Sequence, residues 1–209
     1  MRFSSLADTL TSSRNALYTA HDEVKGAGRP VIDLVKGNVN EHGIVFPGEA
    51  LKAILAEASE RAAVYRPDSF GQPVAREALS TYYGGRIPAA QFVLTPGTSV
   101  SYWYCFKLLA EPGDEILTPQ PSYPLFDYIA QLCGVTLKPY RLDETRQWAI
   151  DLDHLEAQIG ERTRAIVLIS PHNPTGMVAS AESLAGLADI ARRHELPIVS
   201  DEVFNEFIF

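Results

Sequence analysis

Cysteine is scarce in this 209-residue chain, and long hydrophobic runs are missing. The two cysteines, Cys105 and Cys133, form no CxxC pair and have no histidine at ligand spacing, so no metal site is expected. No apolar run reaches the roughly 18 residues that a membrane-spanning helix needs. The first twenty residues also lack the unbroken apolar stretch of a secretory signal. We therefore expect a soluble protein of the cytoplasm that has no membrane partner.

Positive charge is the second feature in short supply. Lysine and arginine number 18 against 26 acidic residues, which gives a formal net charge of -8. Nucleic acids and anionic membranes are held by clustered positive charge, so neither is an expected partner. The hydrophobic share of 46% is ordinary for a globular α/β protein and is enough to form a buried core.

From residue 91 onward, short apolar segments alternate with amphipathic ones. Strands are predicted at 91–95, 115–118, 135–140, 165–169 and 197–200, and helices at 99–110, 124–133, 152–159 and 181–194. Strands joined by helices of this length pair in parallel through right-handed crossovers. The pattern thus predicts an α/β fold, a mostly parallel sheet with helices on both faces.

The chain before this region contains two predicted helices. One begins at Pro47 and ends near Tyr65, and the other runs from 73 to 83, where Gly84-Gly85 suits a left-handed C-cap. The first forty-odd residues are polar and irregular. We expect an N-terminal arm over residues 1–45 and one α/β body over residues 46–209.

Ligands of such sheets bind at the carboxyl ends of the strands, where several reactive or polar residues are expected. Thr98 and Ser99 follow a glycine at a strand-to-helix junction, where backbone amides and hydroxyls suit an anion. An ordinary N-cap accounts for the same residues. Tyr123 follows the next strand, and it can either stack on a planar ligand or fill the rim of the core.

Two more polar residues follow later strands. Asn173 lies in a loop stiffened by two prolines, and its side chain can donate to a ligand oxygen or form an Asx-turn. Asp201 ends the last predicted strand in mostly apolar surroundings, so its carboxylate needs a cationic partner. That partner is either a protonated pyridine nitrogen or an arginine such as Arg192 or Arg193.

In their order and placement these segments resemble the class I/II aminotransferases, fold type I enzymes that use pyridoxal 5'-phosphate (PLP) and are related to aspartate aminotransferase. The resemblance covers residues 31–209. It rests on four segments: Asn173-Pro174-Thr175-Gly176, Ser200-Asp201-Glu202, residues 65–71 and the Pro-Gly-Asp turn at 112–114.

The resemblance implies a role for each candidate. Thr98 and Ser99 would bind the cofactor phosphate, and Tyr123 would stack on the pyridine ring. Asn173 would hydrogen-bond the ring 3-oxygen, and Asp201 would pair with the ring nitrogen and keep it protonated.

The resemblance also implies a shared site. Gly37 would lie beside the substrate carboxylate, and Tyr65 would reach the cofactor phosphate of another subunit, so a homodimer is implied. The arm over residues 1–45 would be part of the family's small domain, and residues 46–209 would form the PLP-binding large domain. The implied setting is cytoplasmic amino acid metabolism, in a biosynthetic process.

Two departures from the family pattern stand out. Phe204 occupies a position where many members carry a tyrosine, so the ring oxygen loses one hydrogen-bond donor. The lysine that forms the Schiff base is missing, because all five lysines present precede Asp201 and are interpreted as solvated or packing residues. We expect that this chain holds no catalytic residue, that it is a fragment truncated before that lysine, and that alone it is inactive.

The leading functional hypothesis is a PLP-dependent aminotransferase that, at full length, transfers an amino group between an amino acid and a 2-oxo acid. Two alternatives remain open from the sequence. One is a PLP-dependent lyase or decarboxylase of the same fold, which Phe204 keeps in consideration. The other is a non-catalytic remnant of the fold.

Overall fold

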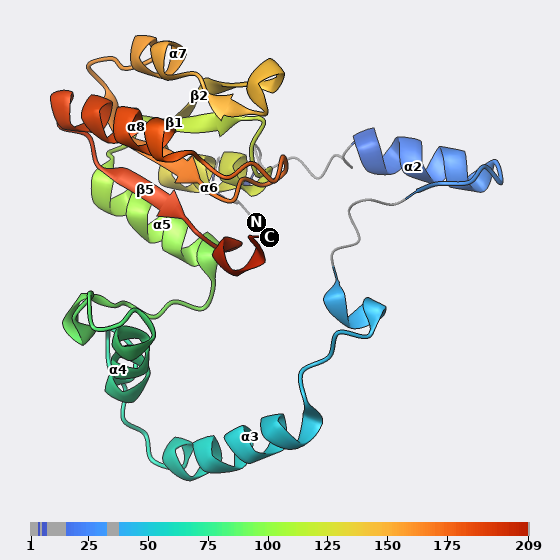
Figure 1. Cartoon of the computed structure of the whole chain (residues 1–209), viewed down its shortest axis with the longest axis vertical. Coiled ribbons are helices and arrows are strands. Elements are labelled where there is room, and N and C mark those ends of the chain that lie inside the picture. Colours follow the sequence, from blue (N-terminus) through green and yellow to red (C-terminus); the bar gives the residue numbers. More distant parts are fainter. Residues whose placement is uncertain (1–3, 5, 8–15, 33–37, 209) are drawn as a thin grey trace. The chain divides into compact units, whose positions relative to one another are not determined.

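The computed structural model describes residues 4, 6–7, 16–32 and 38–208, and the chain divides into two compact units (Figure 1). One unit takes residues 11–94, and the other holds the chain from residue 95 onward. None of the described helices combines the length and the apolar character needed to cross a bilayer.

The unit from residue 95 onward is built on one sheet. Its strands are β1 (Glu115–Gln120), β2 (Thr136–Asp143), β3 (Ala149–Ile150), β4 (Thr163–Ile169) and β5 (Ile198–Asp201). They are ordered β3-β2-β1-β4-β5. Neighbouring strands are parallel except at the pair of β2 and β3. The predicted mostly parallel α/β sheet is confirmed, while β3 was not predicted because two residues are too few for a pattern.

Helices cover both faces of this sheet (Figure 1). On one face lie α5 (Thr98–Leu109) and α6 (Leu125–Cys133), and on the other lie α7 (Leu152–Ala157) and α8 (Ala181–Arg193). Strand β4 shows the division, because Ala165 and Val167 belong to the first core while Ile166 and Leu168 belong to the second. Alternate side chains of a strand point to opposite faces, so this strand is buried on both.

Local signals set the ends of these helices. Asp151 caps α7 by accepting a hydrogen bond from the His154 backbone N–H at 3.0 Å, and Ser180 caps α8 through the Ser183 N–H at 3.1 Å. Helix α6 ends at Gly134, whose φ of 73° lies in the left-handed region that glycine adopts without strain.

The unit over residues 11–94 contains helices and turns. They are α2 (Ala16–Gly26), η1 (Val39–His42), α3 (Gly48–Ala62), α4 (Pro73–Tyr82) and η2 (Ala89–Gln91). Helices α3 and α4 were predicted, and Gly84 and Gly85 follow α4 with φ of 65° and 73°. The prediction that the first forty residues are irregular is wrong for α2. Its 11 residues include two alanines, a leucine, a glutamate and a lysine, which favour helix even without a strong apolar stripe.

The predicted strand at 91–95 is also wrong. Gln91 ends the 3₁₀ turn η2, and Phe92 is extended, with φ of -92° and ψ of 138°. No described strand pairs with residues 92–95, although the Leu94 N–H donates to the Phe70 carbonyl at 2.9 Å. An apolar run predicts extended backbone, whereas a strand also needs a neighbour to bond with.

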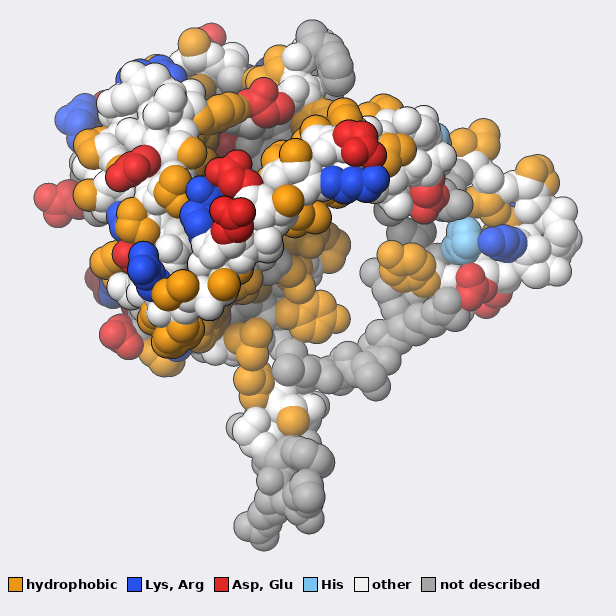
Figure 2. Space-filling model, turned by 90° about the horizontal axis from the view of Figure 1, so that it is seen from below, with side chains coloured by type: hydrophobic (Ala, Val, Ile, Leu, Met, Phe, Trp, Pro, Cys, Tyr) orange, Lys and Arg blue, Asp and Glu red, His pale blue; other side chains and the backbone are white. Residues whose placement is uncertain are grey.

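Helix α3 has the predicted helical period but not the expected burial. Its apolar residues Leu51, Ile54 and Leu55 are 44%, 54% and 58% exposed. Figure 2 shows how widely hydrophobic side chains occur on the surface of the chain. The apolar stripe of α3 is therefore a helix face that other described residues do not cover.

Candidate functional site

A cavity of about 250 Å³ lies at the carboxyl ends of β4 and β5. Its lining residues are Thr98, Ser99, Tyr102, Tyr123, Ile169, Asn173, Asp201, Val203 and Phe204. All of them belong to the unit that starts at residue 95. Five are sequence candidates, so segments that are about a hundred residues apart meet in one place.

Sheet register brings the two later candidates together. Ile169, the last residue of β4, is the partner of Asp201, the last residue of β5. The backbone N–H of Ser170 then donates to the carbonyl of Asp201 at 3.0 Å. The loop that bears Asn173 therefore starts beside Asp201, as expected where parallel strands end at one edge.

The start of α5 has free hydrogen-bond donors. Gly97 precedes the helix, and no side chain caps it. The Thr98 and Ser99 hydroxyls make no hydrogen bond with any residue that the structure describes, whereas Thr95 and Ser101 bond to each other at 2.7 Å. The ordinary N-cap interpretation is thus not supported. The first backbone N–H groups of the helix and two hydroxyls remain available to an anion.

Asp201 receives hydrogen bonds from two neutral donors. The Tyr102 hydroxyl donates to Oδ2 at 2.6 Å, and the Val203 backbone N–H donates to Oδ1 at 3.0 Å. Burial, followed by the bond to Asp201, raises the pKa of Tyr102 far above its usual value, so its hydroxyl keeps its proton. Within the described part of the chain, the carboxylate has no cationic partner.

The two arginines considered as partners of Asp201 lie elsewhere. Arg192 pairs with Asp189, and Arg193 pairs with both Asp189 and Glu156. The bond from Arg193, with a second from His194, lowers the pKa of Glu156 to about 2. These ion pairs belong to the helices α7 and α8, so the arginine alternative for Asp201 is not supported.

The loop that carries Asn173 is held by its own backbone. The His172 N–H donates to the Met177 carbonyl and the Gly176 N–H donates to the His172 carbonyl, both at 2.7 Å. The His172 ring is 3% exposed and hydrogen-bonded to the Thr175 hydroxyl at 2.8 Å. Burial lowers the pKa of His172, although the nearby backbone of Pro121 acts in the opposite direction and raises it. Among the described residues the Asn173 amide has no hydrogen-bond partner, which leaves it free for a ligand.

Two aromatic rings complete the cavity. Tyr123 is 39% exposed and meets Phe126 edge-on, with ring centroids 5.9 Å apart. Phe204 is 40% exposed and meets Phe207 edge-on at 6.2 Å. Both rings thus have a neighbour that fixes them and a surface left open.

A sequence model of the family "Aminotransferase class I and II" matches residues 29–209. The chain belongs to this family. It is 33% identical to the alanine aminotransferase of Mycobacterium tuberculosis strain H37Rv, over 98% of this chain and 48% of that protein. It is also 33% identical to the glutamate-pyruvate aminotransferase AlaA of Escherichia coli K12, over 87% of this chain and 45% of that protein.

Solved aminotransferase structures share the fold. The alanine aminotransferase from Pyrococcus furiosus superposes with a TM-score of 0.80 at 29% identity, over 97% of this chain and 52% of that one. The chain therefore spans about half the length of the relatives it matches. The predicted family and its PLP transferase fold are confirmed, and members of this family are PLP-dependent.

The two other positions that the family resemblance predicted, Gly37 and Tyr65, belong to the N-terminal part of the chain. Tyr65 belongs to the unit over residues 11–94, where its side chain is 90% exposed. Gly37 lies outside the described residues. Their implied contacts with a partner subunit and with substrate stay predictions.

None of the described lysines lines the cavity. Lys52 pairs with Glu49 at 2.7 Å, and Lys138 pairs with Glu115 at 3.5 Å. Lys107 donates to the Cys133 carbonyl at 3.1 Å. These contacts agree with the interpretation of the lysines as solvated or packing residues.

Among the polar residues that line the cavity, Tyr102 is the one that the sequence analysis missed. It lies in the helix predicted at 99–110, and in the structure it is only 4% exposed. A signal was present, because Tyr102 follows Ser99 by three residues and thus lies on the same face of the helix.

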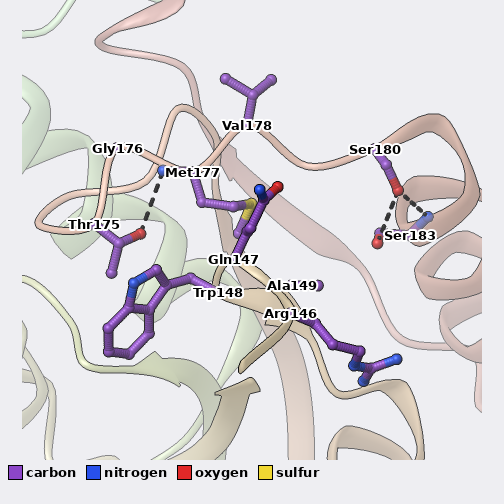
Figure 3. Close-up of a pocket in the computed structure, with 10 residues that line it drawn as sticks. All are labelled: Arg146, Gln147, Trp148, Ala149, Thr175, Gly176, Met177, Val178, Ser180 and Ser183. Atoms are coloured by element: carbon purple, nitrogen blue, oxygen red, sulfur yellow. Dashed lines mark hydrogen bonds between the residues drawn. The ribbon is translucent and has the colours of Figure 1, made fainter. Parts of the chain in front are cut away.

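A larger cavity of about 540 Å³ lies between the residues before β3 and the start of α8 (Figure 3). Its charged residue, Arg146, pairs with Asp143 at 2.7 Å, and Ser180 already caps α8. Bonds from Thr145 and then Arg146 lower the pKa of Asp143 to about 2. This cavity thus offers no uncompensated charge to a ligand.

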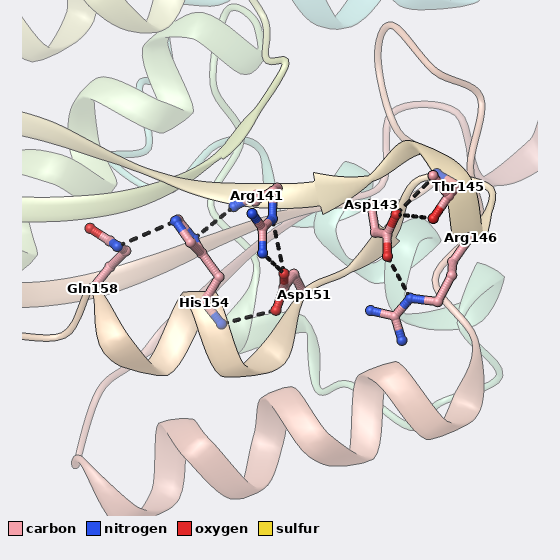
Figure 4. A network of polar contacts seen from close by, with 7 residues as sticks. All are labelled: Arg141, Asp143, Thr145, Arg146, Asp151, His154 and Gln158. Carbon is pink, nitrogen blue, oxygen red and sulfur yellow. Dashed lines mark hydrogen bonds and ion pairs between the residues drawn. The ribbon is translucent and has the colours of Figure 1, made fainter.

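The polar residues beside it are paired in the same way (Figure 4). Arg141 pairs with Asp151, and the Arg141 backbone N–H donates to His154 Nδ1 at 3.1 Å. The Asp151 carboxylate is also the cap of α7. This network is structural, since each of its carboxylates already has a partner.

Proposed function

We propose that the 250 Å³ cavity binds PLP and that this chain belongs to an aminotransferase that transfers an amino group between an amino acid and a 2-oxo acid. One observation carries the proposal. The Asp201 carboxylate, which no described cation neutralises, lines the same cavity as the uncapped start of α5. A ligand that fits this cavity must carry a cationic group for the Asp201 carboxylate and an anionic group for the start of α5.

The residues present fit PLP. Its phosphate suits the free N–H groups at the start of α5 together with the Thr98 and Ser99 hydroxyls. Its planar ring suits the partly open faces of Tyr123 and Phe204. The cavity volume lies just below the roughly 300 Å³ at which small-molecule sites usually begin.

When bound, PLP supplies an electron sink for bond breaking at the amino acid α-carbon. Asp201 favours the protonated ring nitrogen, because a nearby negative charge stabilises a cation. The Asn173 amide donates to the ring oxygen, and Thr98 and Ser99 fix the phosphate. We further propose that this chain alone is inactive, because transamination needs a lysine and none of the described lysines lines the cavity.

The wider setting is also a proposal. The exposed Tyr65 suits a homodimer in which it contacts the phosphate of the partner subunit's cofactor. A cytoplasmic location suits Cys105 and Cys133, which are both free thiols. The printed names of the relatives make alanine and pyruvate the first substrate pair to test. We also propose residues 1–45 as an arm and residues 46–209 as the cofactor domain.

A binding experiment on the 209-residue chain tests the site. Titration with PLP and, separately, with inorganic phosphate is followed by protein fluorescence. Asp201→Asn is expected to weaken PLP at least tenfold and to leave phosphate unchanged, while Thr98→Val with Ser99→Ala weakens both. Asp189→Asn, on the surface of α8, is the control. Equal PLP affinity of Asp201→Asn and the wild type would refute the proposed role of Asp201.

A second experiment tests the reaction. The gene is sequenced beyond the codon for Phe209, and the longest in-frame product is assayed with PLP, alanine and a 2-oxo acid. Formation of pyruvate and pyridoxamine phosphate supports transamination. Release of an amine or of ammonia without pyridoxamine phosphate would instead support the lyase or decarboxylase alternative, which the missing hydroxyl at Phe204 keeps open.

A further inference from the structure

We propose that Tyr102 is a positioning residue, whose hydroxyl holds the Asp201 carboxylate ionised and turned toward a protonated ring nitrogen. The inference rests on the proposed function and deepens it. It assigns a role to a residue that neither the motifs nor the family resemblance identified.

The contact itself is short and directional. The Tyr102 hydroxyl lies 2.6 Å from Asp201 Oδ2, within the range of charge-assisted hydrogen bonds between a hydroxyl and a carboxylate. The two residues are 99 positions apart, so the bond joins α5 on one face of the sheet to the end of β5. Such a bond restricts the carboxylate more than contacts within its own loop can.

Packing fixes the tyrosine ring. Tyr102 meets Phe126 edge-on with centroids 4.6 Å apart, and it meets Phe106 at 6.0 Å. Phe106 is fully buried and Phe126 is 1% exposed, so the ring has little room to turn. The packing of the ring therefore fixes the position of the hydroxyl relative to Asp201.

Two donors then fix the carboxylate plane. Tyr102 bonds to Oδ2, and the Val203 N–H bonds to Oδ1. A carboxylate has about four acceptor sites, so sites remain on both oxygens for a cation in the cavity. Both donors orient the group without cancelling its charge, which an arginine in the same place would do.

The protonation state of Tyr102 supports this role. Burial and the neighbouring carboxylate both raise the pKa of Tyr102 above its usual value near 10, so the phenol is a neutral donor at neutral pH. A phenolate there would repel Asp201 instead of holding it.

Tyr102 also links the two ends of the site. It follows Thr98 by four residues on α5, which is about 6 Å of helix rise. The same helix thus presents its free N–H groups to an anion and, one turn later, holds the Asp201 carboxylate, which can bind a cation. The spacing between these two ends is set by one rigid element.

The test removes the Tyr102 hydroxyl from the protein and replaces one ring atom of the ligand. Tyr102→Phe keeps the aromatic packing and deletes the donor. The 209-residue chain and the variant are each titrated with PLP and with 1-deaza-PLP, in which a C–H group replaces the ring nitrogen. Tyr102→Phe is expected to weaken PLP roughly tenfold and the deaza analogue less than twofold. The control Tyr104→Phe, on an exposed part of the same helix, is expected to change neither.

Equal losses for both ligands, or no loss for either, would overturn the role of Tyr102. On an Asp201→Asn background, Tyr102→Phe should cause no further loss of PLP affinity, and an additional tenfold loss would also overturn it. If the wild-type chain binds neither ligand, the proposed function itself fails. If the chain binds PLP but shows no selective effect of Tyr102→Phe, only the present inference fails.

A second variant keeps the test decisive if Tyr102→Phe does not fold. Tyr102→p-aminophenylalanine retains the ring and supplies an N–H donor in place of the hydroxyl. It is expected to keep the preference for PLP over the deaza analogue to within about threefold of the wild type. Complete loss of that preference in this folded variant would contradict the proposal.

Discussion

Ile169 and Asp201 are partners across the parallel strands β4 and β5, and both are the last residues of their strands. Everything that follows them in the chain therefore starts from the same edge of the sheet. On one side begins the loop with Asn173, and on the other begins the turn with Val203 and Phe204. The positions of these ligand-facing side chains depend on the register of two buried strands.

Phe204→Tyr is expected to tighten PLP binding about three- to tenfold. The added hydroxyl lines the cavity and supplies the donor that many family members carry at this position, and one such bond contributes roughly 1 kcal/mol. Fluorescence titration of the chain with PLP measures the effect. Phe207→Tyr is the matched control, because Phe207 touches Phe204 but does not line the cavity. Unchanged or weaker binding by Phe204→Tyr would contradict the expected geometry.

Gly71→Ala is expected to destabilise the turn that ends before α4. Gly71 has a φ of 93°, and an added Cβ would lie 2.5 Å from the Leu94 side chain. Strain and overlap together should cost at least about 1 kcal/mol. Amide exchange of Leu94, whose N–H bonds to Phe70, should become at least about fivefold faster. Gly48→Ala, which meets nothing within 4 Å, should leave this exchange rate unchanged.

Tyr140→Phe is expected to destabilise the sheet unit by about 1–2 kcal/mol. The Tyr140 hydroxyl donates to the Val167 carbonyl at 2.8 Å, and the side chain is 1% exposed. Because β1 lies between β2 and β4, this bond spans a strand. Its loss removes one buried hydrogen bond. Urea unfolding should show a lower midpoint with an unchanged slope, and Tyr128→Phe, which is 46% exposed, should not shift it.

The stability of the sheet unit should fall as the pH is lowered from about 7 to 5, partly through His172. Burial lowers the pKa of this imidazole below its usual value near 6.5. Below that value the unfolded chain binds a proton that the folded chain does not, so acid favours unfolding, and this effect vanishes above pH 7.

Urea unfolding at several pH values measures this effect. His172→Gln should show a shallower loss of stability between pH 7 and 5 than the wild type. His42→Gln, at an exposed position, should show the wild-type dependence. A steeper loss in His172→Gln would show that the sign is wrong.

The sequence predicted the sheet well because its central strands are buried on both faces. Runs such as residues 165–169 leave little choice of structure, and the alternation with helices then determines parallel pairing. The two errors, at residues 91–95 and at α2, fall where the chain has no such run of residues buried on both faces. Residues 91–95 look like a strand but have no described neighbour, and α2 is a helix without a clear apolar stripe.

Much of the candidate site followed from the same logic. Tyr123, Asn173 and Asp201 each follow a predicted strand that the structure contains, so parallel pairing was enough to gather them. Thr98 is placed instead by the start of α5, because the strand predicted before it does not form. Tyr102 could not be predicted in this way, because its role depends on a hydrogen bond across 99 positions. Its ring belongs to the buried core, whereas its hydroxyl reaches the cavity.

The three-residue interval between Ser99 and Tyr102 limits which insertions and deletions this segment can accept in evolution. An inserted or deleted residue would rotate everything beyond it by about 100° around the axis of α5. The hydroxyl would then face away from β5, while the amide groups at the beginning of the helix stayed where they are. Substitutions inside the interval are tolerable in principle, but its length is fixed.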